Sequence, residues 1–75
     1  MKRDLKRAFG QVIKEQRIAR GLSQQELADY SEMDRTYLSD LERGLNYPTL
    51  NIVFKLCEIL DIKPHLLILK VETLL

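Results

Sequence analysis

Side chains suited to reading base pairs gather between residues 35 and 43 of this 75-residue chain. An arginine can donate two hydrogen bonds to the O6 and N7 atoms of guanine, which is the commonest specific contact to DNA. Hydroxyl groups and further arginines can bind phosphates, and a carboxylate can accept a hydrogen bond from the amino group of cytosine. The side chains of these kinds are Arg35, Thr36, Tyr37, Ser39, Asp40 and Arg43.

Four of these side chains have a clear expected contact. We expect Arg35 to read guanine, because a surface arginine at a helix start otherwise opposes the helix dipole without compensation. Thr36 can present its methyl group to thymine or its hydroxyl to a phosphate. Ser39 and Arg43 suit phosphates, and Arg43 can also reach bases at the edge of the groove.

For Tyr37 and Asp40 the sequence leaves a DNA contact and a structural role both open. Tyr37 can place its ring against base methyl groups or its hydroxyl on the DNA backbone, but half-burial against the preceding helix explains it equally well. Asp40 can accept from cytosine, or it can repel wrong sequences or satisfy local polarity.

A capping box predicts where the first of two short helices begins. Ser23 and Glu26 are three residues apart, so each side chain can bond the backbone N–H of the other. The helix should therefore start at Gln24. Leu27 and Ala28 then face inward, and Ala28 is small enough for a second helix to approach closely.

The second short helix should follow after a turn at residues 31–33. Asp34 can cap it, and Gly44 can end it in the left-handed conformation. Leu38 and Leu41 give it one buried ridge. Because the turn between the two helices is so short, the outer face of the second helix stays free, and the DNA-reading side chains lie on that face.

This layout resembles a known family. Residues 22–44 are similar to the helix-turn-helix of the Cro and phage-repressor type. Within that superfamily, residues 34–39 and 48–50 resemble the small controller proteins of bacterial restriction-modification systems. The similarity extends over about residues 9–67, so most of the chain carries it.

The resemblance also implies roles for residues outside the second helix. Arg17 and Glu42 match positions that form an internal ion pair between the first and third helices. Gln24 matches a residue that contacts the DNA backbone and braces the start of the third helix, and a helix N-terminus itself suits a phosphate. Glu32 stands where the superfamily usually has a left-handed glycine, so either Glu32 adopts that backbone at a cost of ~1 kcal/mol or the turn differs slightly.

Signals along the rest of the chain predict five helices and no strand. The first helix should cover residues 4–20 and end at Gly21, with one apolar face made of Leu5, Phe9, Val12 and Ile13. Thr49 can cap a fourth helix, whose core stripe would be Leu50, Val53, Leu56, Cys57 and Leu60. After a turn at residues 61–63, Pro64 opens a fifth helix. Residues 1–75 are thus expected to form a single all-α, repressor-like DNA-binding domain.

The loop between the third and fourth helices offers two more candidate contacts. Asn46 and Tyr47 can touch the next phosphates, although ordinary turn residues need no such role.

The C-terminal part carries more apolar surface than a monomer of this size should expose. Ile52 and Ile59 fall outside the core stripe of the fourth helix, and Leu66 and Leu69 belong to the apolar fifth helix. These four residues are the candidate seam of a homodimer. An isologous dimer would also present two recognition helices to two half-sites.

Charge is distributed unevenly although the net charge is only +1. Residues 1–20 hold seven basic and two acidic residues, which gives +5, and the remainder is acidic. The basic end can face phosphates. For Lys2, Arg3 and Lys6 taken singly, a solvated helix face is an equally good interpretation.

Composition argues against an enzyme and against a metal or cofactor site. The chain has one histidine and one cysteine, with no glycine-rich phosphate loop and no metal-ligand spacing. Cys57 lies among apolar residues at helical spacing and is expected to be a core residue. No apolar run approaches the ~18 residues of a membrane span, so a cytoplasmic protein is expected.

Taken together, the sequence predicts a transcription regulator that binds double-stranded operator DNA as a homodimer. RNA polymerase is a further candidate partner. By resemblance, the setting is control of restriction-modification genes, including its own gene. The alternative is a protein-interaction module of the antitoxin or coactivator type on the same fold, which would have an acidic or blocked recognition face. Arg35 and Arg43 argue against it.

Overall fold

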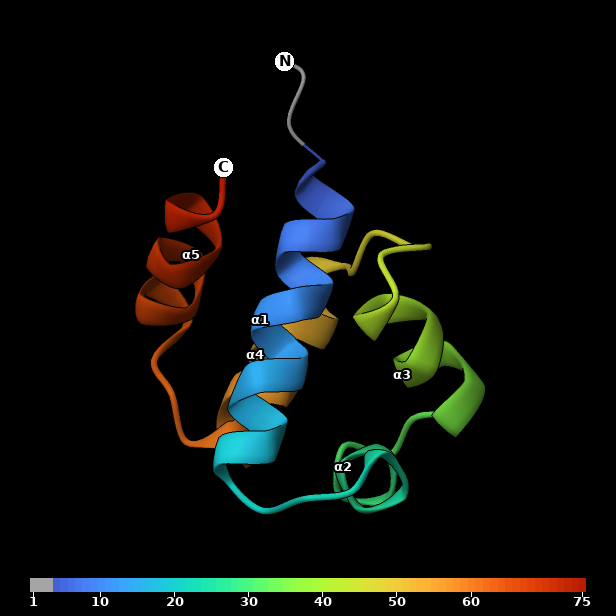
Figure 1. Cartoon of the computed structure of the whole chain (residues 1–75). Coiled ribbons are helices and arrows are strands. Elements are labelled where there is room, and N and C mark those ends of the chain that lie inside the picture. The colour runs from blue at the N-terminus through green and yellow to red at the C-terminus, as the bar shows by residue number, and fades with distance from the viewer. Residues whose placement is uncertain (1–3) are drawn as a thin grey trace.

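Five α-helices follow one another along residues 4–75, which is the part of the chain that the computed structural model describes (Figure 1). They are α1 (Leu5–Ala19), α2 (Gln24–Tyr30), α3 (Arg35–Glu42), α4 (Leu50–Leu60) and α5 (Pro64–Thr73). No strand occurs in this described range, and the predicted all-α class is confirmed. The N-terminal residues Lys2 and Arg3, expected to face phosphates, lie outside the described residues.

The predicted caps set the helix starts. The hydroxyl of Ser23 accepts from the Glu26 N–H at 3.0 Å, and the Glu26 carboxylate accepts from the Ser23 N–H at 2.9 Å. Thr49 caps α4 at 3.1 Å, and Asp34 caps α3 with a longer bond of 3.4 Å to the Thr36 N–H. Each cap satisfies an N–H group that the helix itself leaves unpaired.

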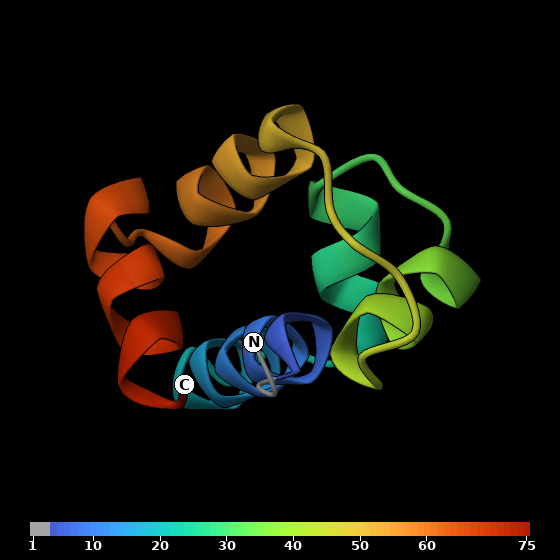
Figure 2. The same ribbon diagram turned by 90° about the horizontal axis from the view of Figure 1, so that it is seen from above.

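α1 forms one side of the molecule, between α5 and α3 (Figure 2). It contacts α3 on one side and α5 on the other, and α4 completes the enclosure of the core (Figure 2). All five helices contribute to that core, which consists of Ala8, Phe9, Val12, Ile13, Leu27, Ala28, Leu38, Leu41, Val53, Leu56, Cys57, Leu60, Leu67 and Val71. Because apolar area removed from water is the main favourable term in folding, this shared core holds α2 and α3 against the rest.

Two residues predicted for the core are exposed instead. Leu50 is 73% exposed and Leu5 is 46% exposed. Each begins its helix, Leu50 in α4 and Leu5 in α1, so the apolar stripe continues past the point where neighbouring helices cover it. The predicted helical period was correct, but the prediction that neighbouring helices bury the first residue of each stripe was wrong.

Gly10, in the middle of α1, allows a close approach between α1 and α3. A Cβ atom there would collide with the carbonyl oxygen of Leu41 and would lie 2.6 Å from that of Glu42. Glycine weakens a helix interior, so its presence here reflects this contact.

Among residues 4–75, no helix has the length and apolar character required to cross a membrane.

Candidate nucleic-acid interface

α2 and α3 form a two-helix unit joined by a tight turn. Glu32 has φ 54°, so of the two possibilities left open by the sequence, Glu32 adopts the strained left-handed conformation. The N–H of Met33 then donates to the carbonyl of Ala28 at 2.9 Å, which ends α2 and redirects the chain into α3. Leu27 and Ala28 are fully buried, as is Leu38 across from them. α3 is therefore held by its inner face, and its outer face remains open.

The open face of α3 forms a polar hollow of about 320 Å³ with the start of α2. The structure brings together five of the predicted DNA-contacting side chains and the undecided Asp40 in this one hollow; its lining is Gln24, Arg35, Thr36, Ser39, Asp40 and Arg43. Arg35 and Thr36 are exposed, whereas Ser39 is half-buried. Tyr37 is half-buried and packs against the core, which is the alternative that its sequence position left open.

Asp40 and Arg43 interact within this hollow. Nη2 of Arg43 lies 2.7 Å from Oδ1 of Asp40, and the side chains are 64% and 28% exposed respectively. The residues are three apart on one helical turn, so their spacing could have predicted the pair.

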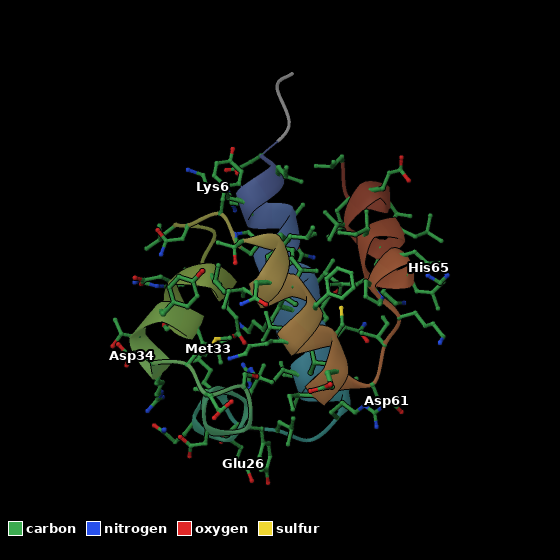
Figure 3. The ribbon with its side chains drawn as sticks, turned by 180° about the vertical axis from the view of Figure 1, so that it is seen from behind. Lys6, Glu26, Met33, Asp34, Asp61 and His65 are labelled. Atoms are coloured by element: carbon green, nitrogen blue, oxygen red, sulfur yellow. The ribbon has the colours of Figure 1, made fainter. Side chains whose placement is uncertain are left out.

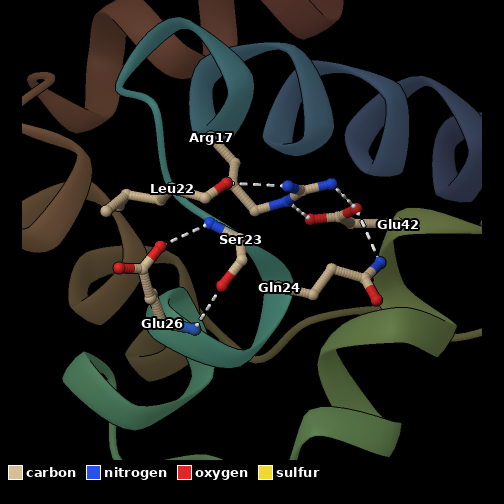
Figure 4. Close-up of polar contacts among 6 residues, drawn as sticks. All are labelled: Arg17, Leu22, Ser23, Gln24, Glu26 and Glu42. Atoms are coloured by element: carbon tan, nitrogen blue, oxygen red, sulfur yellow. Dashed lines mark hydrogen bonds and ion pairs between the residues drawn. The ribbon is translucent and has the colours of Figure 1, made fainter.

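A buried ion pair fixes α3 relative to α1 and α2 (Figure 4). The Arg17 guanidinium donates to the Glu42 carboxylate at 2.7 and 3.0 Å and to the carbonyl of Leu22 at 2.8 Å. The side chains of Arg17 and Glu42 are 11% and 2% exposed. The internal pair that the resemblance implied is confirmed.

Gln24 joins the same network, at a different place from the one expected. Its amide nitrogen donates to Glu42 at 2.9 Å, so it braces the end of α3 and not its start. The expectation was wrong because the first residue of α2 lies within hydrogen-bond distance of Glu42, the last residue of α3. Gln24 also lines the hollow, and its amide oxygen makes no hydrogen bond to the described residues.

The loop after α3 is held against the start of α1. The Lys6 ammonium lies 5.2 Å from the centre of the Tyr47 ring, within the range of a cation–π contact. Gly44, at φ 76°, packs so closely on Arg7 that a Cβ atom would lie 2.7 Å from its side chain. Tyr47 is 62% exposed and Asn46 is half-buried, and neither of them lines the hollow. Tyr47 lines a separate pocket with residues of α1, α4 and α5. No local pattern in the sequence could have paired Lys6 with Tyr47.

Comparison with known proteins agrees with this geometry. Residues 13–67 match the model of the helix-turn-helix family. The chain belongs to this family. It is 32% identical over 65 residues to the control protein C.BamHI of Bacillus amyloliquefaciens, a match that covers 85% of this chain and 80% of C.BamHI.

Solved structures of regulators share the fold. The restriction-modification controller protein C.AhdI of Aeromonas hydrophila is similar at a TM-score of 0.80 and 45% identity, over 85% of this chain and 96% of C.AhdI. SinR, the master regulator for biofilm formation, was solved in complex with DNA. It is similar at a TM-score of 0.76 and 36% identity, over 80% of this chain and 97% of that one. The resemblance to Cro-type and controller proteins is confirmed, and the chain is a helix-turn-helix regulator of the DNA-binding class.

Three of the basic residues within residues 4–20 have partners inside the folded chain. Arg17 is committed to Glu42, and Arg20 pairs with Asp61 at 2.8 Å while donating to the carbonyl of Leu60. Lys6 lies over Tyr47. Arg7 and Lys14 are exposed, so whether the basic end faces phosphates stays a prediction.

The four candidate seam residues differ in exposure. Leu66 and Leu69 of α5 are 43% and 53% exposed. Ile52 and Ile59 of α4 are half-buried and pack against the core, which corrects the expectation that they lie apart from it. Phe54 of α4, not singled out from sequence, is 55% exposed. Apolar surface is therefore exposed on both helices. On α5 the predicted leucines provide it, whereas on α4 Phe54 provides it in place of Ile52 and Ile59.

Cys57 is buried in the core, as predicted. Burial raises the pKa of its thiol, so the group stays protonated near neutral pH and is a weak nucleophile.

Proposed function

We propose that this protein binds operator DNA as a homodimer and regulates transcription, controlling restriction-modification genes that include its own. The observation that carries this proposal is the position of Arg35. It is exposed at the first residue of α3, and among residues 4–75 it has no hydrogen-bond or ion-pair partner.

An unpaired cation at this position needs an external explanation. The N-terminus of a helix carries partial positive charge, so Arg35 makes α3 slightly less stable. A guanine edge in the major groove supplies two acceptors for a guanidinium and explains the position. Thr36 and Ser39 lie beside Arg35 in the same hollow, where they can bind bases or phosphates.

The network around Glu42 supports recognition by a preset surface. Arg17 and Gln24 both donate to Glu42, so α3 is tied to α1 and α2 before any ligand arrives. A rigid element places side chains more accurately than a mobile loop does. The fold therefore sets where the backbone of α3, which carries Arg35, lies relative to the start of α2.

A homodimer is supported by the size of the reading surface and by the exposed apolar residues. α3 has 8 residues, and a single short recognition helix contacts too few base pairs for a useful specificity ratio. Two copies related by a two-fold axis would read half-sites about one helical turn apart, roughly 34 Å. Leu66 and Leu69 of α5 would then lose their exposure in the seam.

The restriction-modification setting rests on the relatives. C.BamHI and C.AhdI are both controller proteins of this kind, and the chain matches most of the length of each. RNA polymerase enters the proposal as the machinery on which a promoter-bound regulator would act.

Selection of bound sites from a random pool of duplex DNA tests the proposal directly. We expect enrichment of two-fold symmetric sites with a guanine at the corresponding position of each half. Enrichment of single half-sites would contradict the homodimer. If no sequence is enriched, the chain is better described as a protein-interaction module on this fold.

A further inference from the structure

The ion pair between Asp40 and Arg43 lies in the surface that is proposed to meet DNA. Both side chains line the hollow with Arg35, and Nη2 of Arg43 is 2.7 Å from Oδ1 of Asp40. The other carboxylate oxygen makes no hydrogen bond to the described residues. The hollow therefore contains an anion where a polyanion is expected to bind.

The fold gains little from this pair. Arg43 is 64% exposed, and exposed pairs three residues apart on a helix contribute little stability because water screens them. Arg43 is also the C-cap residue of α3, where a cation is favourable without any partner. Stability alone does not explain a carboxylate here.

Binding to DNA gives the carboxylate a clear effect. Asp40 repels phosphates and the acceptor atoms O6 and N7 of guanine, and it holds one of the two arginines of the hollow. A base amino group, as on cytosine or adenine, can instead donate to this carboxylate and take the place of the arginine. Asp40 therefore weakens binding to unmatched DNA more than it weakens binding to a matched site.

We propose that Asp40 is a specificity-determining residue that acts through Arg43. On unmatched DNA the pair persists and withholds Arg43 from the phosphates. On a matched site a base amino group donates to the Asp40 carboxylate in place of Arg43, and Arg43 then binds the backbone. This inference rests on the proposed DNA binding and adds a named source of discrimination to it.

The variant Asp40→Asn tests this assignment because it removes the charge at nearly constant shape. Binding to the selected site and to a random-sequence duplex would be measured over a range of salt concentrations. We expect about threefold to tenfold tighter binding to random DNA, with a salt slope steeper by about 0.9, since one more phosphate contact forms. The ratio of specific to random affinity should fall by about tenfold, as for loss of one base contact.

Asp61→Asn is the matched control. Asp61 also forms an exposed ion pair with an arginine, at 2.8 Å from Arg20, and lies on the opposite side of the molecule from Asp34 at the start of α3 (Figure 3). Asparagine tolerates the left-handed backbone of Asp61, so the fold is preserved. This variant should leave the salt slope and the affinity ratio unchanged.

A second variant separates release of Arg43 from simple loss of a negative charge. In the Arg43→Gln background, Asp40→Asn should no longer steepen the salt slope. If it still does, or if Asp40→Asn behaves like Asp61→Asn in the wild-type background, the inference is overturned while DNA binding stands. A wild-type protein with no preference for any sequence would overturn the proposed function itself.

Discussion

At the scale of single residues, Glu42 is the side chain on which the recognition unit depends. It accepts hydrogen bonds from Arg17 of α1 and Gln24 of α2, and it closes the last turn of α3. Its side chain is 2% exposed, so these donors replace the hydrogen bonds that water would make to the carboxylate. The polar network therefore fixes how the three helices meet.

Replacing only one of Arg17 and Glu42 should lower the unfolding free energy much more, relative to the charge removed, than replacing both. Arg17→Met leaves the Glu42 carboxylate buried with one remaining donor, and Glu42→Leu leaves the guanidinium without its anion. Each should cost ~3–5 kcal/mol of unfolding free energy, whereas the double variant should lose far less than their sum. Urea unfolding of the three variants measures this coupling. Small, additive losses would contradict a buried pair of this importance.

Arg35 should control discrimination between sequences. Arg35→Ala should lower the ratio of specific to random affinity by the equivalent of ~1–3 kcal/mol, because a bidentate guanine contact is lost. Lys63→Ala removes one cation at the start of α5, away from the hollow, and serves as the control. Competition binding with selected and scrambled duplexes gives the ratio. An unchanged ratio for Arg35→Ala would show that another side chain reads the guanine.

At the scale of elements, the turn between α2 and α3 contains local strain. Glu32 has φ 54°, which costs a non-glycine residue ~1 kcal/mol, and its ion pair with Lys55 is exposed and long at 4.0 Å. Glu32→Gly should therefore raise the unfolding free energy by about 0.5–1 kcal/mol.

Asp61 provides a comparison for the turn. It has φ 53°, but aspartate tolerates this conformation better than glutamate because its short side chain can bond locally. Asp61→Gly should therefore raise the unfolding free energy by less than Glu32→Gly does. Urea unfolding of both variants measures the two increases. Equal gains would mean that the residue type at the turn is irrelevant.

The close packing of α1 on α3 should make Gly10→Ala destabilising, although helix propensity favours alanine. Gly10→Ala improves an isolated helix by about 0.5–1 kcal/mol, but the added methyl group collides with the carbonyls of Leu41 and Glu42. Overpacking of this kind costs about 1–3 kcal/mol, so the net effect should be a loss. Thermal unfolding of the variant decides the sign. A raised melting temperature would show that the helices can part without cost.

At the scale of the whole molecule, the exposed apolar residues of α5 bear on assembly. Leu69→Asp should give a folded monomer, because Leu69 is 53% exposed and contributes little to the core. In a two-fold seam the introduced charge is present twice and is buried. Ile59→Asp is a less clean test, because Ile59 packs against the core and its loss would also weaken the fold.

Tyr30→Asp is the control for assembly. Tyr30 is 59% exposed at the end of α2, and α2 and α5 lie at opposite sides of the molecule (Figure 2). Analytical ultracentrifugation of the wild type and both variants should show two dimers and one monomer. A wild type that stays monomeric at micromolar concentration, or a Leu69→Asp variant that still dimerises, would place the seam elsewhere or remove it.

Local patterns in the sequence determined the helix starts and the outer face of α3. Ser23, Asp34 and Thr49 cap the helices they were expected to cap, because capping acts within three residues. The same short range let Arg35 and Thr36 be assigned to one face from spacing alone. The ion pair of Arg17 with Glu42 joins distant segments, and only the resemblance to a family pointed to it.

Tertiary structure alone decided which apolar and charged residues are available at the surface. Helical periodicity placed Leu50 on the core stripe and Ile52 off it, yet Leu50 is 73% exposed and Ile52 packs against the core. Arg20 counted as a free basic residue until the fold placed Asp61 beside it. Periodicity describes one helix, whereas burial and pairing depend on which other helix covers each face, and that is set by the packing of the whole chain.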